Sequence, residues 1–187
     1  MSVRHGLLAL LEDGPKYGYQ LRAAFEQQTG GTWPLNVGQV YTTLARLDRD
    51  GLVVATGDDG HGHNVYALTH AGHAEVTQWF ATPVARTDRP RDELAIKLSL
   101  ALMVPGVDVH TVVQAQRTAT LQDLQELTRL KMQAGDDDLA WLLVLDSLIF
   151  QAEAETRWLD SCEQRLVRHP RATATRRPAV DVEAVRR

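Results

Sequence analysis

The sequence predicts a mainly α-helical protein with one small β-hairpin, divided into two domains. Apolar residues recur at three- and four-residue steps through most of the chain, which is typical of amphipathic helices. Only residues 52–68 change to two short β-rich runs around a tip rich in Gly and Asp, which predicts a hairpin. Residues 82–90 contain two prolines and scattered charge, as linkers do. We therefore expect a first domain over residues 1–81 and a second over residues 91–168.

Three helices are expected before the hairpin, over residues 3–11, 17–29 and 37–50. Each is followed by a break that contains glycine: Asp13-Gly14-Pro15, Gly30-Gly31 and Gly51. Trp33-Pro34-Leu35 predicts a rigid apolar connector, since proline restricts the residue before it to an extended conformation. Asn36 has a side chain that can cap the third helix.

The hairpin is expected from residues 52–55 and 65–68, which flank the polar residues 57–64. Thr69 can then cap a helix over residues 70–80. The first domain thus reads helix, helix, helix, hairpin, helix.

Three helices are expected in the second domain, over residues 91–103, 107–134 and 138–168. The last one is apolar on two sides, so it needs two partners. One partner can be residues 107–134, and we expect the other to be a second subunit. The dimerisation residues predicted on this basis are Trp141, Leu142, Leu145, Leu148, Ile149, Ala152, Trp158 and Leu159. Residues 169–187 are rich in arginine and lack a hydrophobic period, so we expect a disordered tail.

Composition excludes several classes of protein. No apolar run among the 187 residues approaches the roughly 20 needed to cross a bilayer. The N-terminal residues also lack a cleavage site of the secretory kind. The single cysteine, Cys162, excludes an intramolecular disulfide and fits a reducing compartment. We expect a cytoplasmic protein without a membrane partner.

Charge bears on the kind of partner. The formal net charge of the chain is −4, and residues 1–80 hold five basic against eight acidic side chains. A DNA-binding domain is more often basic. Any DNA surface must therefore be a local patch, and affinity should depend on two such patches acting together.

The expected third helix has two chemically different faces. With a turn of about 100° per residue, Val40, Leu44 and Leu47 lie on one side and predict the core face. The opposite side and its flanks hold Gly38, Gln39, Tyr41, Thr42, Arg46 and Arg49. Hydroxyls, amides and guanidinium groups can contact phosphates and base edges in a major groove. An isolated helix could carry such a face merely for solvation, but here a hairpin follows at once. Helix, turn, helix and hairpin is an arrangement in which the third helix enters the groove.

Three motifs in this order resemble the PadR family of transcriptional regulators. Residues 14–21, GPKYGYQL, resemble the family's GPxyGYeL, and residues 40–53 resemble its vYptLkrLeedGLi block. Residues 65–72 are similar to its YxlTxxG exit from the wing. This chain has Thr42-Thr43 where the family commonly has a proline. The match covers residues 3 to about 80, and residues 91–97, RDELAIK, resemble members with a longer C-terminal part.

The resemblance implies contacts with the DNA backbone and base edges for Tyr17, Tyr19, Tyr41, Thr42 and Arg46. The tyrosines could equally be core residues whose hydroxyls find a backbone partner. Gly18 is expected to permit close approach of the second helix to a neighbour. The full predicted DNA-binding set is Lys16, Tyr17, Tyr19, Asn36, Gln39, Tyr41, Thr42, Arg46, Arg49, His61, His63 and Asn64.

The sequence evidence for metal binding, catalysis or a reactive cysteine is weaker. His61 and His63 lack an evident third ligand, so a wing tip near phosphate explains them better than a metal. Three acids at 136–138 suit the positive end of a helix dipole better than a cation. We find no phosphate loop, nucleophile elbow or His-x-x-x-His pair, and expect no enzyme and no cofactor. Cys162 has Arg165 one turn away, but it lies on an apolar seam and is expected to pack.

Two hypotheses for function follow. The first is a dimeric repressor that binds a pseudo-palindromic operator on double-stranded DNA and is released by a small-molecule effector. Family members that sense small aromatic compounds suggest an aromatic effector, with Trp79, Trp141 and Trp158 as cavity residues or simply as core. The second is a winged-helix module for protein contacts, which the acidic first domain keeps open.

Overall fold

The computed structural model describes residues 3–58, 63–84, 92–135 and 137–169. The chain divides into two compact units, residues 1–84 and 85–187. The predicted linker and the predicted tail lie largely outside the described residues.

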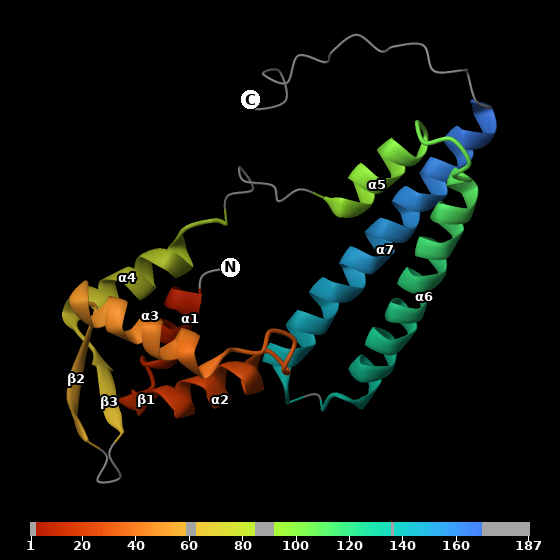
Figure 1. Cartoon of the computed structure of the whole chain (residues 1–187). Coiled ribbons are helices and arrows are strands. Elements are labelled where there is room, and N and C mark those ends of the chain that lie inside the picture. Colours follow the sequence, from red (N-terminus) through yellow and green to blue (C-terminus); the bar gives the residue numbers. More distant parts are fainter. Residues whose placement is uncertain (1–2, 59–62, 85–91, 136, 170–187) are drawn as a thin grey trace. The chain divides into compact units, whose positions relative to one another are not determined.

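The described residues of the first unit form four helices and three strands (Figure 1). They are α1 (Val3–Leu10), β1 (Lys16–Tyr17), α2 (Gly18–Gln28), α3 (Val37–Arg49), β2 (Val53–Asp58), β3 (Asn64–Leu68) and α4 (His70–Ala81). The predicted order of helix, helix, helix, hairpin and helix is confirmed. Strand β1 was not predicted, because two residues are too few to show a period.

The three strands form an antiparallel sheet in the order β1-β3-β2. Lys16 is opposite Tyr66, so the start of α2 is tied to the middle of the hairpin. The β2–β3 register shifts between Ala55 and Gly57, and Gly57 has a φ of +128°, a value that favours glycine. We call β2, β3 and the residues that join them the wing.

The core of this unit draws on every helix and on strands β2 and β3. Its buried side chains are Leu7, Leu8, Leu11, Leu21, Leu35, Val40, Leu44, Leu47, Leu52, Val53, Tyr66 and Val76. The α2–α3 connector joins this core through Leu35, whose N–H also donates to the Glu26 carboxylate at 3.3 Å. That bond and the Arg22 guanidinium hold the pKa of Glu26 below its ordinary value, Arg22 having the larger effect.

Caps and close contacts fix the helix ends. The side chain of Thr69 accepts from the N–H of Gly72 at 3.1 Å, as predicted for the start of α4. Gly72 lies against the backbone carbonyl of Leu52, leaving no room for a Cβ atom. Gly72, the glycine of the wing-exit motif, is therefore required by the contact between α4 and the start of β2. Gly30 and Gly31 end the turn after α2 with φ of +56° and +70°.

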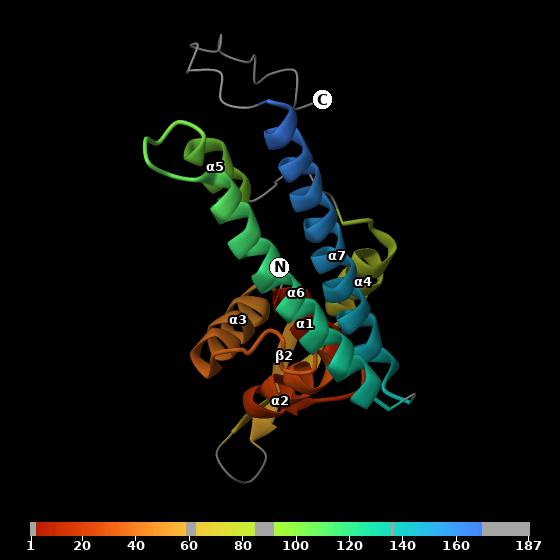
Figure 2. The same cartoon turned by 90° about the vertical axis from the view of Figure 1, so that its right-hand side faces the viewer.

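The second unit is a helical hairpin with a third helix at its open end (Figure 2). Its helices are α5 (Glu93–Ala101), α6 (Val109–Gln133) and α7 (Leu139–Arg168). Leu98 and Ala101 of α5 pack with Val109, Val113 and Leu159 in one cluster. None of the described helices is long and apolar enough to span a membrane.

Polar bridges fix the antiparallel register of α6 and α7. The Glu155 carboxylate accepts from the Thr120 hydroxyl at 2.6 Å and from the Gln116 amide at 3.0 Å. Nearer the end of α7, Arg117 donates to Asp160 at 2.8 Å. Cys162 packs beside the cluster, and burial raises the pKa of its thiol despite the opposing charge of Arg165. This environment agrees with a packing role for Cys162.

Candidate nucleic-acid interface

Helix α3 presents one buried and one exposed face. Val40, Leu44 and Leu47 are fully buried, as the helical period predicted. Gly38, Gln39, Thr42, Arg46 and Arg49 are exposed on the other side. The predicted core face is confirmed, and the polar residues expected at DNA share one accessible surface.

The start of α3 is held by Asn36. Its side-chain oxygen accepts from the N–H of Gly38 at 2.8 Å, which confirms the predicted cap. A capping oxygen leaves the NH₂ group of the same amide available as a donor. Asn36 can therefore cap the helix and still offer donors at its surface.

The two threonines of α3 bond to their own helix. The Thr42 hydroxyl donates to the carbonyl of Gly38 at 2.8 Å, and Thr43 donates to Gln39 at 2.7 Å. The helix is thus continuous where the family commonly has a proline. A phosphate accepts hydrogen bonds, so Thr42 must leave this bond to donate to one.

The two arginines of α3 are in different electrostatic states. Arg46 forms no ion pair with any residue in the described part of the chain. Arg49 lies 3.6 Å from the Asp50 carboxylate, which lies 3.7 Å from Arg4 of α1. Arg46 therefore offers an unshared positive charge, whereas that of Arg49 is partly offset.

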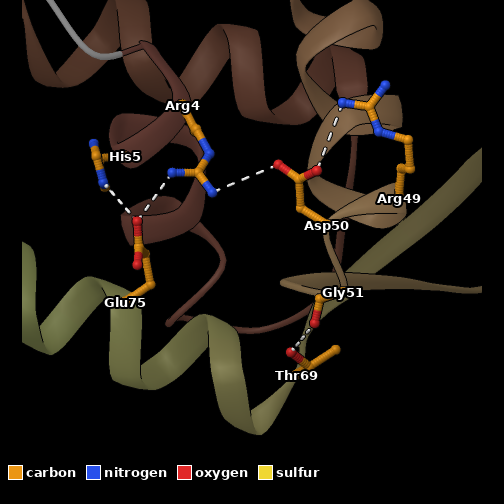
Figure 3. A network of polar contacts seen from close by, with 7 residues as sticks. All are labelled: Arg4, His5, Arg49, Asp50, Gly51, Thr69 and Glu75. Carbon is orange, nitrogen blue, oxygen red and sulfur yellow. Dashed lines mark hydrogen bonds and ion pairs between the residues drawn. The ribbon is translucent and has the colours of Figure 1, made fainter.

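A network behind the end of α3 joins it to α1 and α4 (Figure 3). Glu75 accepts from Arg4 at 2.9 Å and lies 3.1 Å from the His5 ring nitrogen. The hydroxyl of Thr69 donates to the carbonyl of Gly51 at 2.7 Å. The His5 hydrogen bond, and then Arg4, hold the pKa of Glu75 below its ordinary value. Sequence reasoning missed this network, since the partners of Glu75 are about 70 residues away and follow no periodic pattern.

Lys16 has intrachain partners that the sequence did not indicate. Its ammonium donates to the carbonyl of Leu10 at 3.0 Å and lies 3.4 Å from both the Gly14 carbonyl and the Asp13 carboxylate. A cation is favourable at a helix C-terminus, where carbonyls lack partners. The charge of Lys16 therefore stabilises the end of α1, and a DNA contact for it stays a prediction.

The tyrosines occupy three distinct environments. Tyr17 stacks on His63 with ring centroids 4.9 Å apart, joining β1 to the residue before β3. Tyr41 lies against Gly18, where an added Cβ would stand 2.8 Å from its ring, so Gly18 allows α2 and α3 to approach as predicted. Tyr19 is the most exposed, at 59%.

The wing contributes Asn64, which is exposed at the start of β3, and His63. His61 lies outside the described residues. No group of three or more His, Cys, Asp or Glu within the described residues could hold a metal ion.

Three helices followed by a two-stranded wing, with a polar face on the third helix, define a winged helix-turn-helix protein. Residues 7–78 match the family described as "Transcriptional regulator PadR-like family", and residues 90–167 match "Virulence activator alpha C-term". The first unit of this chain therefore contains a domain of the PadR-like family of transcriptional regulators.

Similar proteins extend over nearly the whole chain. The probable transcriptional regulator Rv1176c of Mycobacterium tuberculosis is 28% identical, over 89% of this chain and 98% of its own. The negative transcriptional regulator PadR of Bacillus subtilis is 24% identical, over 85% and 94%. The crystal structure of B. subtilis PadR with operator DNA has a TM-score of 0.68 at 19% identity, and covers 89% of this chain and 99% of its own. The same protein with p-coumaric acid gives a TM-score of 0.70 at 19% identity, with 88% and 98% covered. These similarities support the predicted fold.

Proposed function

We propose that this regulator binds double-stranded DNA as a homodimer, with α3 of each subunit in a major groove. One observation carries the proposal: three residues of α3 are fully buried, while Gln39, Thr42 and Arg46 are exposed on the opposite side. Such side chains can reach base edges and phosphates. A two-fold dimer would set two copies of α3 on a pseudo-palindromic operator.

The wing and the start of α2 would follow the flanking backbone. Tyr17 and His63 are stacked on each other, and Asn64 is exposed beside them. Phenol, imidazole and amide groups can all donate to phosphate oxygens. This group would fix the orientation of α3, and Arg46 would contribute most to reading the sequence.

Dimerisation is assigned to α7. Leu145 and Leu159 of the predicted set are fully buried in the single chain, so their packing is already complete. Large apolar side chains that the predicted seam omitted remain exposed on α7, among them Phe150 at 64% and Leu139 at 65%. Leu143, which is 63% exposed, is also absent from the predicted dimerisation set. An apolar stripe along a helix of 30 residues fits a second copy of α7.

The proposal that this chain represses transcription and is released by an aromatic effector is based on a relative. The B. subtilis relative is named a negative regulator, and its structure with p-coumaric acid is known. In this chain Trp79 stacks on His5 with centroids 5.4 Å apart, and Trp141 is half-buried. An aromatic acid could stack on such rings.

Fluorescence anisotropy with the DNA upstream of the chain's own gene tests the proposal. Competition with unlabelled duplex of unrelated sequence should leave the specific complex largely intact. Affinity should fall steeply along a salt series, because bound phosphates release counterions. Absence of binding at low salt would instead favour a winged-helix module for protein contacts, which the acidic first domain supports.

A further inference from the structure

The carboxylate of Asp50 lies between two guanidinium groups from different helices (Figure 3). Arg49 of α3 is 3.6 Å away and Arg4 of α1 is 3.7 Å away. Both distances exceed those of direct hydrogen bonds, so the two arginines share one negative charge at similar range. Arg4 is bound more closely, at 2.9 Å, by Glu75 of α4.

Asp50 cannot easily leave this position. It is the C-cap of α3, and its N–H donates to the Arg46 carbonyl at 2.9 Å. The next residue, Gly51, has a φ of +72° and accepts from Thr69 at 2.7 Å. The backbone that carries the carboxylate is thereby attached to α4.

An acidic side chain is electrostatically unfavourable at this end of a helix. The C-terminus of a helix carries partial negative charge, which favours cations. Arg4 and Arg49 offset that cost, but exposed ion pairs of this kind contribute little to stability. Stability alone therefore gives a weak reason for a carboxylate here.

We propose that Asp50 is a positioning residue that withholds part of the charge of Arg49 from DNA phosphates, and that Arg4 sets how strongly it does so. The inference rests on the proposed function, since it assumes that α3 meets DNA. Arg49 is the more accessible partner, with 75% of its side chain exposed, so it can turn from Asp50 to a phosphate. To do so it must give up the carboxylate, which lowers affinity for DNA of any sequence.

Arg4 has the opposite effect on the affinity for DNA. Its guanidinium draws on the same carboxylate from α1, so less of the Asp50 charge acts on Arg49. Loss of Arg4 would leave Asp50 to Arg49 alone and weaken the phosphate contact. Loss of Asp50 would release Arg49 whether or not Arg4 is present.

Anisotropy of the full chain with a random-sequence duplex, over a salt series, tests these relations. Asp50→Asn should raise affinity about two- to fivefold, the range of an exposed ion pair. It should also steepen the slope of log K against log salt by up to about 0.9, which corresponds to one more phosphate contact. As a single substitution, Arg4→Gln should lower the affinity for DNA. In the Asp50→Asn background it should have no effect.

Asp48→Asn is the matched control. It removes the same charge from the same turn of α3, and Asp48 forms no ion pair with any described residue. It should change affinity slightly and leave the salt slope unchanged. Equal effects of Asp48→Asn and Asp50→Asn would overturn the inference, since general charge would explain both.

Two further outcomes separate this inference from the proposed function. If the unmodified chain binds no DNA, the proposed function fails and the inference fails with it. If the chain binds DNA and Arg46→Ala weakens binding, but Asp50→Asn changes neither affinity nor slope, only the inference is wrong. If circular dichroism shows that the Asp50→Asn protein does not fold, Arg4→Gln still tests the inference, because Asp50 stays in place. DNA affinity should then fall.

Discussion

The ring of Tyr41 lies so close to Gly18 that a methyl group on this glycine would stand 2.8 Å from two ring carbons. The atoms in the way are the outer part of a side chain that is 37% exposed, so the ring can turn outward. At Gly72 the obstacle is the backbone carbonyl of Leu52, which cannot move without shifting β2. Both glycines therefore allow neighbouring segments to approach closely, but an added side chain is tolerated better at Gly18 than at Gly72.

Gly72→Ala should destabilise the chain much more than Gly18→Ala. Overpacking against backbone costs about 1–3 kcal/mol or more, whereas a side chain that can turn away should cost less. Chemical denaturation followed by circular dichroism measures both free energies of unfolding. Equal losses would mean that Tyr41 is held as firmly as the backbone of Leu52.

Arg46→Ala should weaken operator binding by about 1–3 kcal/mol if the guanidinium reads a guanine, and by less if it contacts phosphate. The helix should remain intact, because Arg46 is exposed and forms no ion pair with any described residue. Anisotropy with operator and with random duplex separates the two roles. Arg129→Ala, in the second unit, removes the same charge as a control. Full affinity in a folded Arg46→Ala protein would exclude α3 from the interface as proposed.

Much of the first unit could be predicted from sequence because its signals are local. The period of Val40, Leu44 and Leu47 predicted the buried face of α3, and Asn36 and Thr69 were recognised as caps from neighbouring residues alone. The residue types on the exposed face followed from the same period.

What the sequence could not predict depends on contacts between distant segments. Strand β1 exists because Lys16 and Tyr17 pair with β3, about 50 residues later. The interaction of Arg4 with Asp50 and Glu75 requires three helices to be in place. On α7, the apolar period placed Leu145 in the predicted dimerisation set and omitted Phe150, yet in the single chain Leu145 is fully buried and Phe150 is 64% exposed.

Thr120→Val should destabilise the second unit by about 1.5–3 kcal/mol, because it removes a hydrogen bond to a charged group. The Thr120 hydroxyl is 2.6 Å from the Glu155 carboxylate, and Thr120 is only 4% exposed. Thr118→Val is the control, since that exposed hydroxyl donates only to the Gln114 carbonyl of its own helix. Thermal melts of the two variants should differ. Identical melts would show that Glu155 is satisfied by Gln116 or solvent.

Glu75→Gln should lower stability at neutral pH and lose this effect in acid. The pKa of Glu75 is held below its ordinary 4.5 in the folded chain, mainly by the His5 hydrogen bond and then by Arg4. The unfolded chain thus takes up the proton first, so the stabilisation is complete above about pH 4.5 and disappears as pH falls through the lower folded value. Melting temperatures from about pH 7 to about pH 3 measure the difference from the unmodified chain. A difference that persists unchanged in acid would mean that the charge of Glu75 is not what stabilises the fold.

Leu143→Ala with Phe150→Ala should dissociate the proposed dimer while leaving each chain folded. Both side chains are more than 60% exposed in the single chain, so their loss opens no internal cavity. Leu145→Ala is the informative contrast, because Leu145 is fully buried. That change should cost about 2–5 kcal/mol of stability through the cavity it leaves.

Analytical ultracentrifugation gives the oligomeric state, and thermal melts give the stability of the same samples. The double substitution of Leu143 and Phe150 should change the oligomeric state and leave the fold of each chain intact. Leu145→Ala should mainly lower the thermal stability. DNA affinity should then fall sharply in the Leu143, Phe150 variant, because each half-site would be bound by a single domain with an excess of acidic residues. A tight dimer that survives the double substitution would move the subunit interface away from this stripe of α7, and full DNA affinity in a proven monomer would remove the need for two linked copies of α3.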